Sequence, residues 1–183
     1  MSKHIFKHII VTFAIAVLGV STSFAAFVME RDQSVDTAPS VGMYRFEVPV
    51  ELQGTYNSAG VANLTASMEK EPNTLSMNVA HVKGNPSESY VVEIYKDLAA
   101  IEAHRKSDYY QAFVNEVGSK LTNRKMYDVQ SVLLFEKKDA LSIVNDGKAV
   151  VTLTEFTVDS NEIDTVQRQY QLDMERAVRD DAG

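Results

Sequence analysis

His81 and His104 are the only histidines beyond the first 25 residues of this 183-residue chain, and they are its first candidates for acid–base chemistry. An unperturbed imidazole has a pKa of about 6.5, so His104 could accept a phenolic proton near neutral pH as a catalytic general base. It also follows Ala100 by one helical turn, where a histidine can simply bond local backbone or a carboxylate. No metal-ligand spacing connects the two histidines, and we predict no metal site.

Tyrosines form the second candidate group, because each offers a flat apolar surface and one hydroxyl to an aromatic ligand. Core packing is the alternative, and it suits Tyr110 best because that residue falls in a helical apolar stripe. Arg45 could hold an anionic oxygen, or it could pair with a carboxylate such as Glu47 or Glu93. The candidate ligand-binding residues are Arg45, His81, Tyr95, Tyr109 and Tyr127.

The N-terminal segment, residues 1–25, has the form of a secretory signal peptide. Lys3 and Lys7 precede a mainly apolar run over residues 9–20, and the small residues of "STSFAA" follow. We expect cleavage after Ala25 and a periplasmic or secreted protein. The alternative is a retained membrane anchor, but the apolar run is shorter than the about 20 residues that span a bilayer. We therefore expect no membrane association after cleavage.

The composition limits the classes of partner. The formal charge is −7 at pH 7 and becomes −9 without residues 1–25, which hold two lysines and no acids. An acidic exported chain is a poor candidate for binding nucleic acid or anionic membranes. The chain has no cysteine, which excludes disulfides, thiolate catalysis and cysteine-based zinc sites.

The elements that must position the candidate residues follow from apolar periodicity, after a linker at residues 26–41. The first helix is expected to start at Asn57 or Ser58, with a stripe of Val61, Leu64 and Met68. A second helical region over residues 97–121 is capped by Asp97 and interrupted at residues 106–108. The predicted strands are residues 42–50, 74–82, 90–95 and 126–138.

Together these elements give the order β-α-β-β-α-β over residues 42–138. That order predicts an α+β, ferredoxin-like domain, with an antiparallel sheet whose helices lie on one face. After a linker at residues 139–148 the pattern restarts, with a strand in "AVVTLTEFTV" and a capped helix up to residue 183. We interpret residues 149–183 as the first strand and helix of a second repeat in a truncated chain. The alternative is that these last elements pack on the first domain.

Residues 42–138 resemble the antibiotic biosynthesis monooxygenase family of dimeric α+β barrels. The resemblance rests on the run "SMEKEPNTLSMNVAHVKGNPSESYVVEIYKDLAAIEAHRKSDYYQAF". This run has an acidic turn after the first helix, a strand with a late His and a strand ending Glu-x-aromatic. An Asp, an Ala, a His and a Ser-Asp-Tyr-Tyr stretch follow in order. No single motif is specific, whereas the order and spacing together are moderately so.

The resemblance implies sheets packed face to face, either in a homodimer or between tandem units of one chain. It also implies a pocket between the sheet and its helices. Glu93 lies on the strand face opposite Tyr90, Val92 and Ile94. We expect it at the barrel interface in an architectural role, where its charge needs a partner.

The resemblance implies a cofactor-independent monooxygenase for a small aromatic or quinol, with His104 matching the family histidine, and the N-terminal segment makes it an exported one. Such enzymes bind the substrate, deprotonate it and exclude water while oxygen reacts with the anion. Tyr95 stands where active relatives often have Trp, which weakens this prediction. Phe113 lies near where haem-degrading relatives have their iron ligand, so haem cleavage is not expected. Two alternatives are a non-catalytic ligand-binding or stress-response module and an assembly protein whose sheet contact is its function.

Overall fold

The computed structural model describes residues 26–28, 39–127, 129, 131–137 and 151–180. The chain divides into two units: residues 31–131, and residues 1–30 together with 132–183. The predicted signal peptide and the predicted linker at residues 139–148 lie outside the described residues. Each unit is considered by itself.

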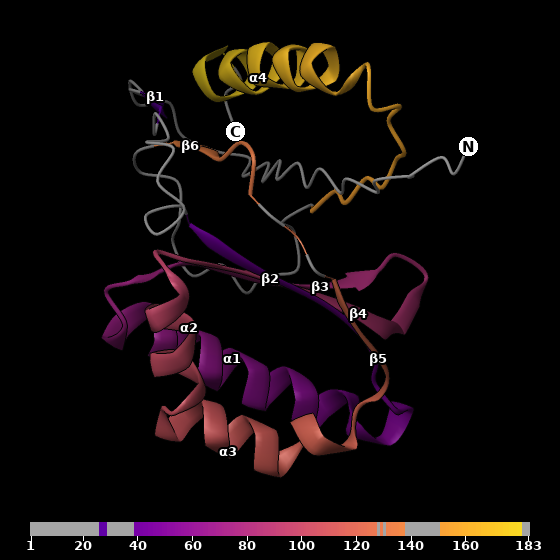
Figure 1. The fold of residues 1–183 in the computed structure, drawn as a ribbon. Coiled ribbons are helices and arrows are strands. Elements are labelled where there is room, and N and C mark those ends of the chain that lie inside the picture. The colour runs from indigo at the N-terminus through magenta and orange to yellow at the C-terminus, as the bar shows by residue number, and fades with distance from the viewer. Residues whose placement is uncertain (1–25, 29–38, 128, 130, 138–150, 181–183) are drawn as a thin grey trace, which may run out of the picture. The chain divides into compact units, whose positions relative to one another are not determined.

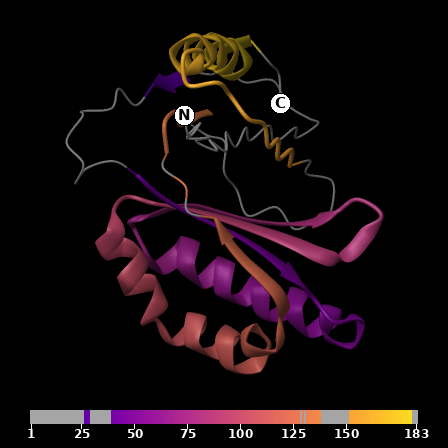
Figure 2. The same cartoon turned by 45° about the vertical axis from the view of Figure 1, so that its right-hand side comes forward.

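The unit over residues 31–131 contains a four-stranded sheet in the order β3-β4-β2-β5, with every neighbouring pair antiparallel (Figure 1). Its strands are β2 (Ser40–Glu47), β3 (Thr74–Val82), β4 (Asn85–Tyr95) and β5 (Thr122–Tyr127). Its α-helices are α1 (Gln53–Lys70), α2 (Leu98–Arg105) and α3 (Asp108–Glu116). All three helices lie on one face of the sheet (Figure 2). The predicted α+β, ferredoxin-like arrangement is confirmed.

The break in the second helical region is also confirmed, and local hydrogen bonds explain it. The Asp97 side chain accepts from the backbone N–H of Ala100 at 2.8 Å and caps α2. Ser107 then accepts from the N–H of Tyr110 at 3.3 Å and caps α3. Each cap provides an acceptor for a backbone amide in the first turn of its helix. For this reason α2 can end at Arg105 and α3 can begin at Asp108.

The start and the buried face of α1 differ from the prediction. The helix begins at Gln53, after a short 3-10 turn over Val50–Leu52, and neither Asn57 nor Ser58 caps it. Val61 is 37% exposed. The buried face carries Tyr56, Ala59, Asn63 and Ser67. The predicted apolar stripe did not identify the buried face of α1, because two of the four buried residues, Asn63 and Ser67, are polar.

The fourth strand begins and ends earlier than predicted: it ends at Tyr127 rather than at residue 138, and residues 131–134 are not in a strand. After α3, a 3-10 turn over Gly118–Lys120 leads directly into β5, which starts at Thr122 rather than at residue 126. Thr122 pairs with Glu47 and Tyr127 with Met43. Among the described strands β5 pairs only with β2, so it is an edge strand there, and its side chains from Thr122 to Met126 are exposed. Edge strands need no apolar alternation, which is why the sequence pattern missed this one.

The strand register decides which side chains face the helices. Tyr44 pairs with Val91, and Met77 pairs with Glu93. Paired residues of antiparallel strands point to the same face. Tyr44, Val91 and Glu93 all line a pocket under the helices. The expectation that Glu93 lies at a sheet-to-sheet interface was therefore wrong.

A core cluster anchors the helices at one end of the sheet. Val48, Tyr56, Ala59, Val117 and Leu121 are buried together, and Phe46 and Phe113 pack against them. The Tyr56 hydroxyl shares a 2.8 Å hydrogen bond with the Ser89 hydroxyl of β4. This bond satisfies a buried polar group and ties α1 to the middle of the sheet.

The other unit contains three described elements. Strand β1 (Ala26–Val28) pairs antiparallel with β6 (Phe135–Lys137), and helix α4 (Ile163–Asp180) completes it. The predicted strand over residues 149–158 is absent within residues 151–158. An isolated extended segment without a partner ladder leaves its backbone groups unpaired, so strand propensity alone was insufficient. The second repeat stays a prediction.

Helix α4 carries the expected apolar stripe. Its partly buried side chains include Ile163, Val166, Tyr170, Met174 and Val178. Phe156 stacks on Tyr170 with ring centroids 5.4 Å apart. Within the described part of the chain, no helix is both long enough and apolar enough to cross a membrane.

Candidate functional site

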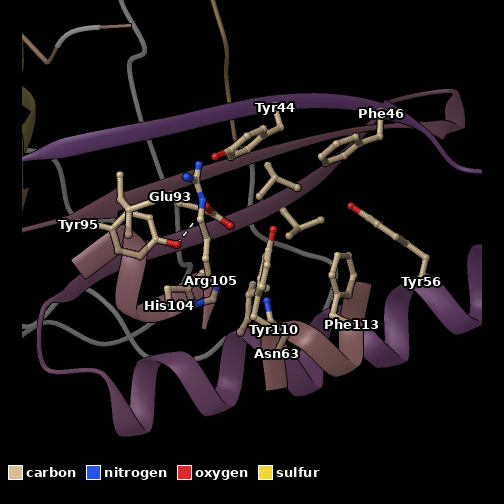
Figure 3. Close-up of a pocket in the computed structure, with 15 residues that line it drawn as sticks. Tyr44, Phe46, Tyr56, Asn63, Glu93, Tyr95, His104, Arg105, Tyr110 and Phe113 are labelled. Atoms are coloured by element: carbon tan, nitrogen blue, oxygen red, sulfur yellow. Dashed lines mark hydrogen bonds between the residues drawn. The ribbon is translucent and has the colours of Figure 1, made fainter. Parts of the chain in front are cut away.

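A pocket lies between the sheet and the helices of the unit over residues 31–131, and tyrosine and phenylalanine side chains form part of its wall (Figure 3). Tyr44 and Phe46 reach into it from β2, while Tyr110 and Phe113 approach from α3. Its enclosed volume is about 90 Å³. An engineered cavity that holds benzene has about 150 Å³. We therefore expect at most one ring to enter, and part of that ring to remain at the mouth.

His104 lies at the bottom of this pocket and is only 1% exposed. Its Nδ1 atom lies 3.0 and 3.2 Å from the two carboxylate oxygens of Glu71 and 3.3 Å from the Ser67 hydroxyl. Its ring packs edge-on against Tyr110, with centroids 4.8 Å apart. Packing and hydrogen bonds therefore hold the imidazole in one orientation.

Two buried polar atoms have no hydrogen-bond partner among the described residues: His104 Nε2 and Asn63 Oδ1. Both residues line the pocket. An unsatisfied buried polar atom costs about 1–3 kcal/mol, so it calls for an explanation such as a catalytic or binding role. These two atoms are the strongest sign that the pocket receives a polar ligand.

Glu93 places a carboxyl group in the same pocket, from the middle of the sheet. The Tyr95 hydroxyl donates to it at 3.1 Å, shown as the dashed line in Figure 3. Burial raises the pKa of the Glu93 carboxyl above its ordinary value, although nearby His104 and the Tyr95 hydrogen bond work in the opposite direction. Burial and the neighbouring Glu93 carboxyl also raise the pKa of Tyr95, so Tyr95 acts as a neutral donor.

Arg105 places a cationic side chain at the wall of the same pocket. Its guanidinium interacts with Tyr44, and that hydrogen bond raises the pKa of Arg105. It also forms a 3.1 Å ion pair with Glu102 at the surface. A positive charge at the pocket wall favours an anionic form of a bound ligand.

The structure brings only some of the sequence candidates together. Tyr95 and His104 both line the pocket, with ring centroids 5.7 Å apart. Tyr109 lies behind His104, where its hydroxyl donates to Glu71. His81 lies elsewhere, 3.2 Å from Asn57 on α1, and is exposed.

Arg45 and Tyr127 belong to the sheet face that points away from the pocket. Arg45 lies 2.5 Å from Glu88 and 3.7 Å from Glu47, which matches the alternative of a sheet-face ion pair. Tyr127 pairs with Met43 in the register, and Lys125 lies 4.1 Å above its ring. The sequence candidates therefore lie on both faces of the sheet.

Sequence reasoning missed three polar pocket residues: Asn63, Glu93 and Arg105. The spacing along α1 places four residues on one helix face: Tyr56, Ala59, Asn63 and Ser67. The sequence pattern did not predict this face because only apolar residues were counted. Alternation of side chains along the strand correctly placed Glu93 on the face opposite Val92 and Ile94. The alternation did not show which of the two faces of the sheet the helices cover.

The position of Glu93 leads to a prediction about stability. Because burial raises its pKa in the folded state, the free energy of unfolding falls as pH rises through that raised pKa. We expect Glu93→Gln to be more stable than the wild type at about pH 8 and to lose this advantage by about pH 4. Urea unfolding at both pH values measures the difference, with the exposed Glu116→Gln as control. A constant difference between the two conditions contradicts the prediction.

The fold and the pocket define a class: ferredoxin-like α+β proteins that enclose a small site between sheet and helices. Residues 41–116 match the family model described as antibiotic biosynthesis monooxygenase. The family resemblance seen in the sequence is thereby confirmed for this part of the chain.

Two solved structures show the same fold. A candidate antibiotic biosynthesis monooxygenase from Bacteroides thetaiotaomicron is 21% identical with a TM-score of 0.50, over 52% of this chain and 91% of that chain. A candidate monooxygenase from Fusobacterium nucleatum is 17% identical with a TM-score of 0.52, over 72% of this chain and 55% of that chain. The search of curated proteins found no match.

Proposed function

We propose that this protein is an exported, cofactor-independent monooxygenase that acts on a small aromatic or quinol in the pocket. The observation that carries the proposal is a pair of buried atoms, His104 Nε2 and Asn63 Oδ1, that have no hydrogen-bond partner in the described part of the chain and belong to residues lining a partly aromatic pocket. A ring hydroxyl is a donor of the right kind for either atom. The about 90 Å³ of enclosed space favours a single ring over a fused aromatic system.

In the proposed reaction, His104 Nε2 takes a proton from a substrate hydroxyl, and Arg105 favours the resulting anion. Molecular oxygen then reacts with the electron-rich ring. For a quinol, one oxygen atom enters the ring and the other leaves as water, and the substrate supplies all four electrons. The product is a hydroxylated quinone. The protein contributes proton transfer, orientation and exclusion of bulk water.

The test is oxygen consumption by the purified full chain with a panel of monocyclic quinols and phenols. We expect uptake without added flavin or metal, and the same rate when either is added. Uptake that requires an added cofactor, or no uptake by folded protein across the panel, overturns the proposal. In the second case, ligand binding without turnover would favour the alternative of a non-catalytic binding module.

Ligand binding has its own expected result. At about ten times its dissociation constant a ligand stabilises the folded state by about 1.4 kcal/mol, enough to raise Tm by several degrees. We expect this shift with a monocyclic quinol and not with its dimethyl ether, which lacks both donors. Differential scanning fluorimetry of the full chain checks it. Equal shifts with both compounds would mean that the acceptor pair does not recognise the ligand.

Export and sheet pairing are parts of the same proposal. The sequence of residues 1–25 supports export, and N-terminal sequencing of the native protein is expected to begin at Ala26. The family resemblance supports pairing of the sheet in a homodimer or with a tandem unit of the same chain. The mass of the native protein in solution distinguishes these arrangements.

A further inference from the structure

Glu71 lies behind His104 and has no place in the reaction proposed so far. It ends α1 as the C-cap residue, and its side chain is 13% exposed. Three groups approach its carboxylate: the Tyr109 hydroxyl, the Thr74 hydroxyl at 2.5 Å and His104 Nδ1 at 3.0 Å. An ionised carboxylate only accepts hydrogen bonds, so it can satisfy all three donors at once.

Ser67, the other neighbour of His104 Nδ1, is also an acceptor toward the ring. Its hydroxyl proton is used in a 2.8 Å hydrogen bond to the backbone carbonyl of Asn63. The oxygen that lies 3.3 Å from Nδ1 therefore presents a lone pair. Because both neighbours of Nδ1 accept, the proton of a neutral imidazole belongs on Nδ1.

The second ring nitrogen then carries the lone pair. His104 Nε2 is buried without a partner among the described residues, and the residue lines the pocket. Among the described residues Nε2 has no hydrogen-bond partner in either protonation state, so the acceptors beside Nδ1 decide the tautomer. The arrangement therefore favours Nε2 as the basic nitrogen.

We propose that Glu71 is a positioning residue that holds the proton of His104 on Nδ1 and leaves Nε2 as the basic nitrogen of this pocket-lining residue. Its consequence for turnover rests on the proposed function, whereas the tautomer itself does not. A carboxylate that orients a catalytic histidine through Nδ1 is a known arrangement in unrelated hydrolases.

The tautomer can be read directly by ¹⁵N NMR of the full chain labelled at histidine. The chain also contains His4, His8 and His81, so the signals that disappear in His104→Gln are assigned to His104. In the wild type we expect Nε2 to resonate as an unprotonated nitrogen and Nδ1 as a protonated one near neutral pH. Protonation at Nε2, or equal signals from both nitrogens, overturns the proposal.

Two variants test whether Glu71 is the cause. Glu71→Ala leaves only Ser67 beside Nδ1, so we expect both nitrogen shifts to move toward an average of the two tautomers. Glu71→Gln retains an amide oxygen that can accept, and we expect it to keep more of the wild-type pattern. Glu69 is an exposed residue near Glu71, and Glu69→Ala removes the same charge. We expect this control variant to leave the ¹⁵N shifts of His104 unchanged. An unchanged pattern in folded Glu71→Ala overturns the role of Glu71.

Should Glu71→Ala fail to fold, Glu71→Asp provides the second test. Its shorter side chain is expected to lengthen the contact with Nδ1 and to move the two ¹⁵N shifts partly toward the averaged pattern. Wild-type shifts in folded Glu71→Asp and Glu71→Gln alike would overturn the role of Glu71.

Oxygen uptake separates the two proposals. If the wild type turns over, Glu71→Ala should lower kcat roughly 10- to 100-fold with a smaller change in KM, and Glu71→Gln should recover part of it. An unchanged kcat in folded Glu71→Ala overturns the positioning role. A wild type that shows the Nδ1-protonated spectrum without turnover contradicts the proposed function and leaves the tautomer assignment standing.

Discussion

His104→Gln is expected to lower kcat for oxygen uptake by about 10²- to 10⁴-fold in a protein that remains folded, the usual contribution of a positioned general base. The imidazole is 1% exposed and is held by Glu71, so its Nε2 is fixed relative to the pocket. Glutamine can still bond Glu71 through its amide but has no basic nitrogen. The rate therefore falls while the local hydrogen bonding is largely kept.

The matched control for this experiment is His81→Gln. His81 is exposed, lies outside the pocket and contacts Asn57 on α1. We expect less than a twofold change in kcat, because His81 does not line the pocket and meets it only through an edge-on contact with the Tyr56 ring, with centroids 6.0 Å apart. Steady-state oxygen consumption, with circular dichroism to verify folding, compares the two variants. Equal activity of His104→Gln and the wild type would remove His104 from the chemistry.

Tyr95→Ala is expected to lower the free energy of unfolding by about 3–5 kcal/mol, as for other buried aromatic side chains truncated to alanine. Tyr95 is 1% exposed and is the largest of the fully buried side chains in the described residues. Its ring packs beside His104, so its loss leaves a cavity under the site. A domain of ordinary stability, about 5–15 kcal/mol, would lose much of it.

Tyr95→Phe separates packing from hydrogen bonding at the same position. It keeps the ring but removes the hydroxyl that donates to Glu93 at 3.1 Å, and we expect a loss of about 1–2 kcal/mol. Met126→Ala, at a side chain that is 70% exposed, serves as control and should change stability by less than about 0.5 kcal/mol. Urea unfolding measures all three variants. Equal losses for Tyr95→Ala and Tyr95→Phe would mean that the ring contributes little.

Local features of the fold were predictable because their causes are local. Asp97 and Ser107 each bond an amide three residues ahead, which is visible in the sequence as a capping residue before a helical pattern. The order of the elements along the chain and the ferredoxin-like class followed from the succession of such patterns. The sequence analysis predicted the start of α1 and the edge strand β5 at the wrong residues, because the side chains there do not follow an apolar period.

The polar part of the site was less accessible to prediction, because its residues are distant in the chain. Glu71 reaches His104 across 33 positions and Tyr109 across 38. Asn63 and Ser67 occupy a helix face that is expected to be apolar. Such contacts depend on how the helices are placed over the sheet, and periodicity carries no information about that placement.

The sequence by itself determined the order of the elements from the first strand to the fourth, the family resemblance and the choice of His104 and Tyr95 as candidates. Only the tertiary structure decided that Glu93 faces the helices and that Arg45 and Tyr127 face away from them. It also placed Glu71 beside Nδ1 of His104. The physical reason is that alternation along a strand divides its residues between two faces, whereas packing of the helices decides which face becomes the pocket.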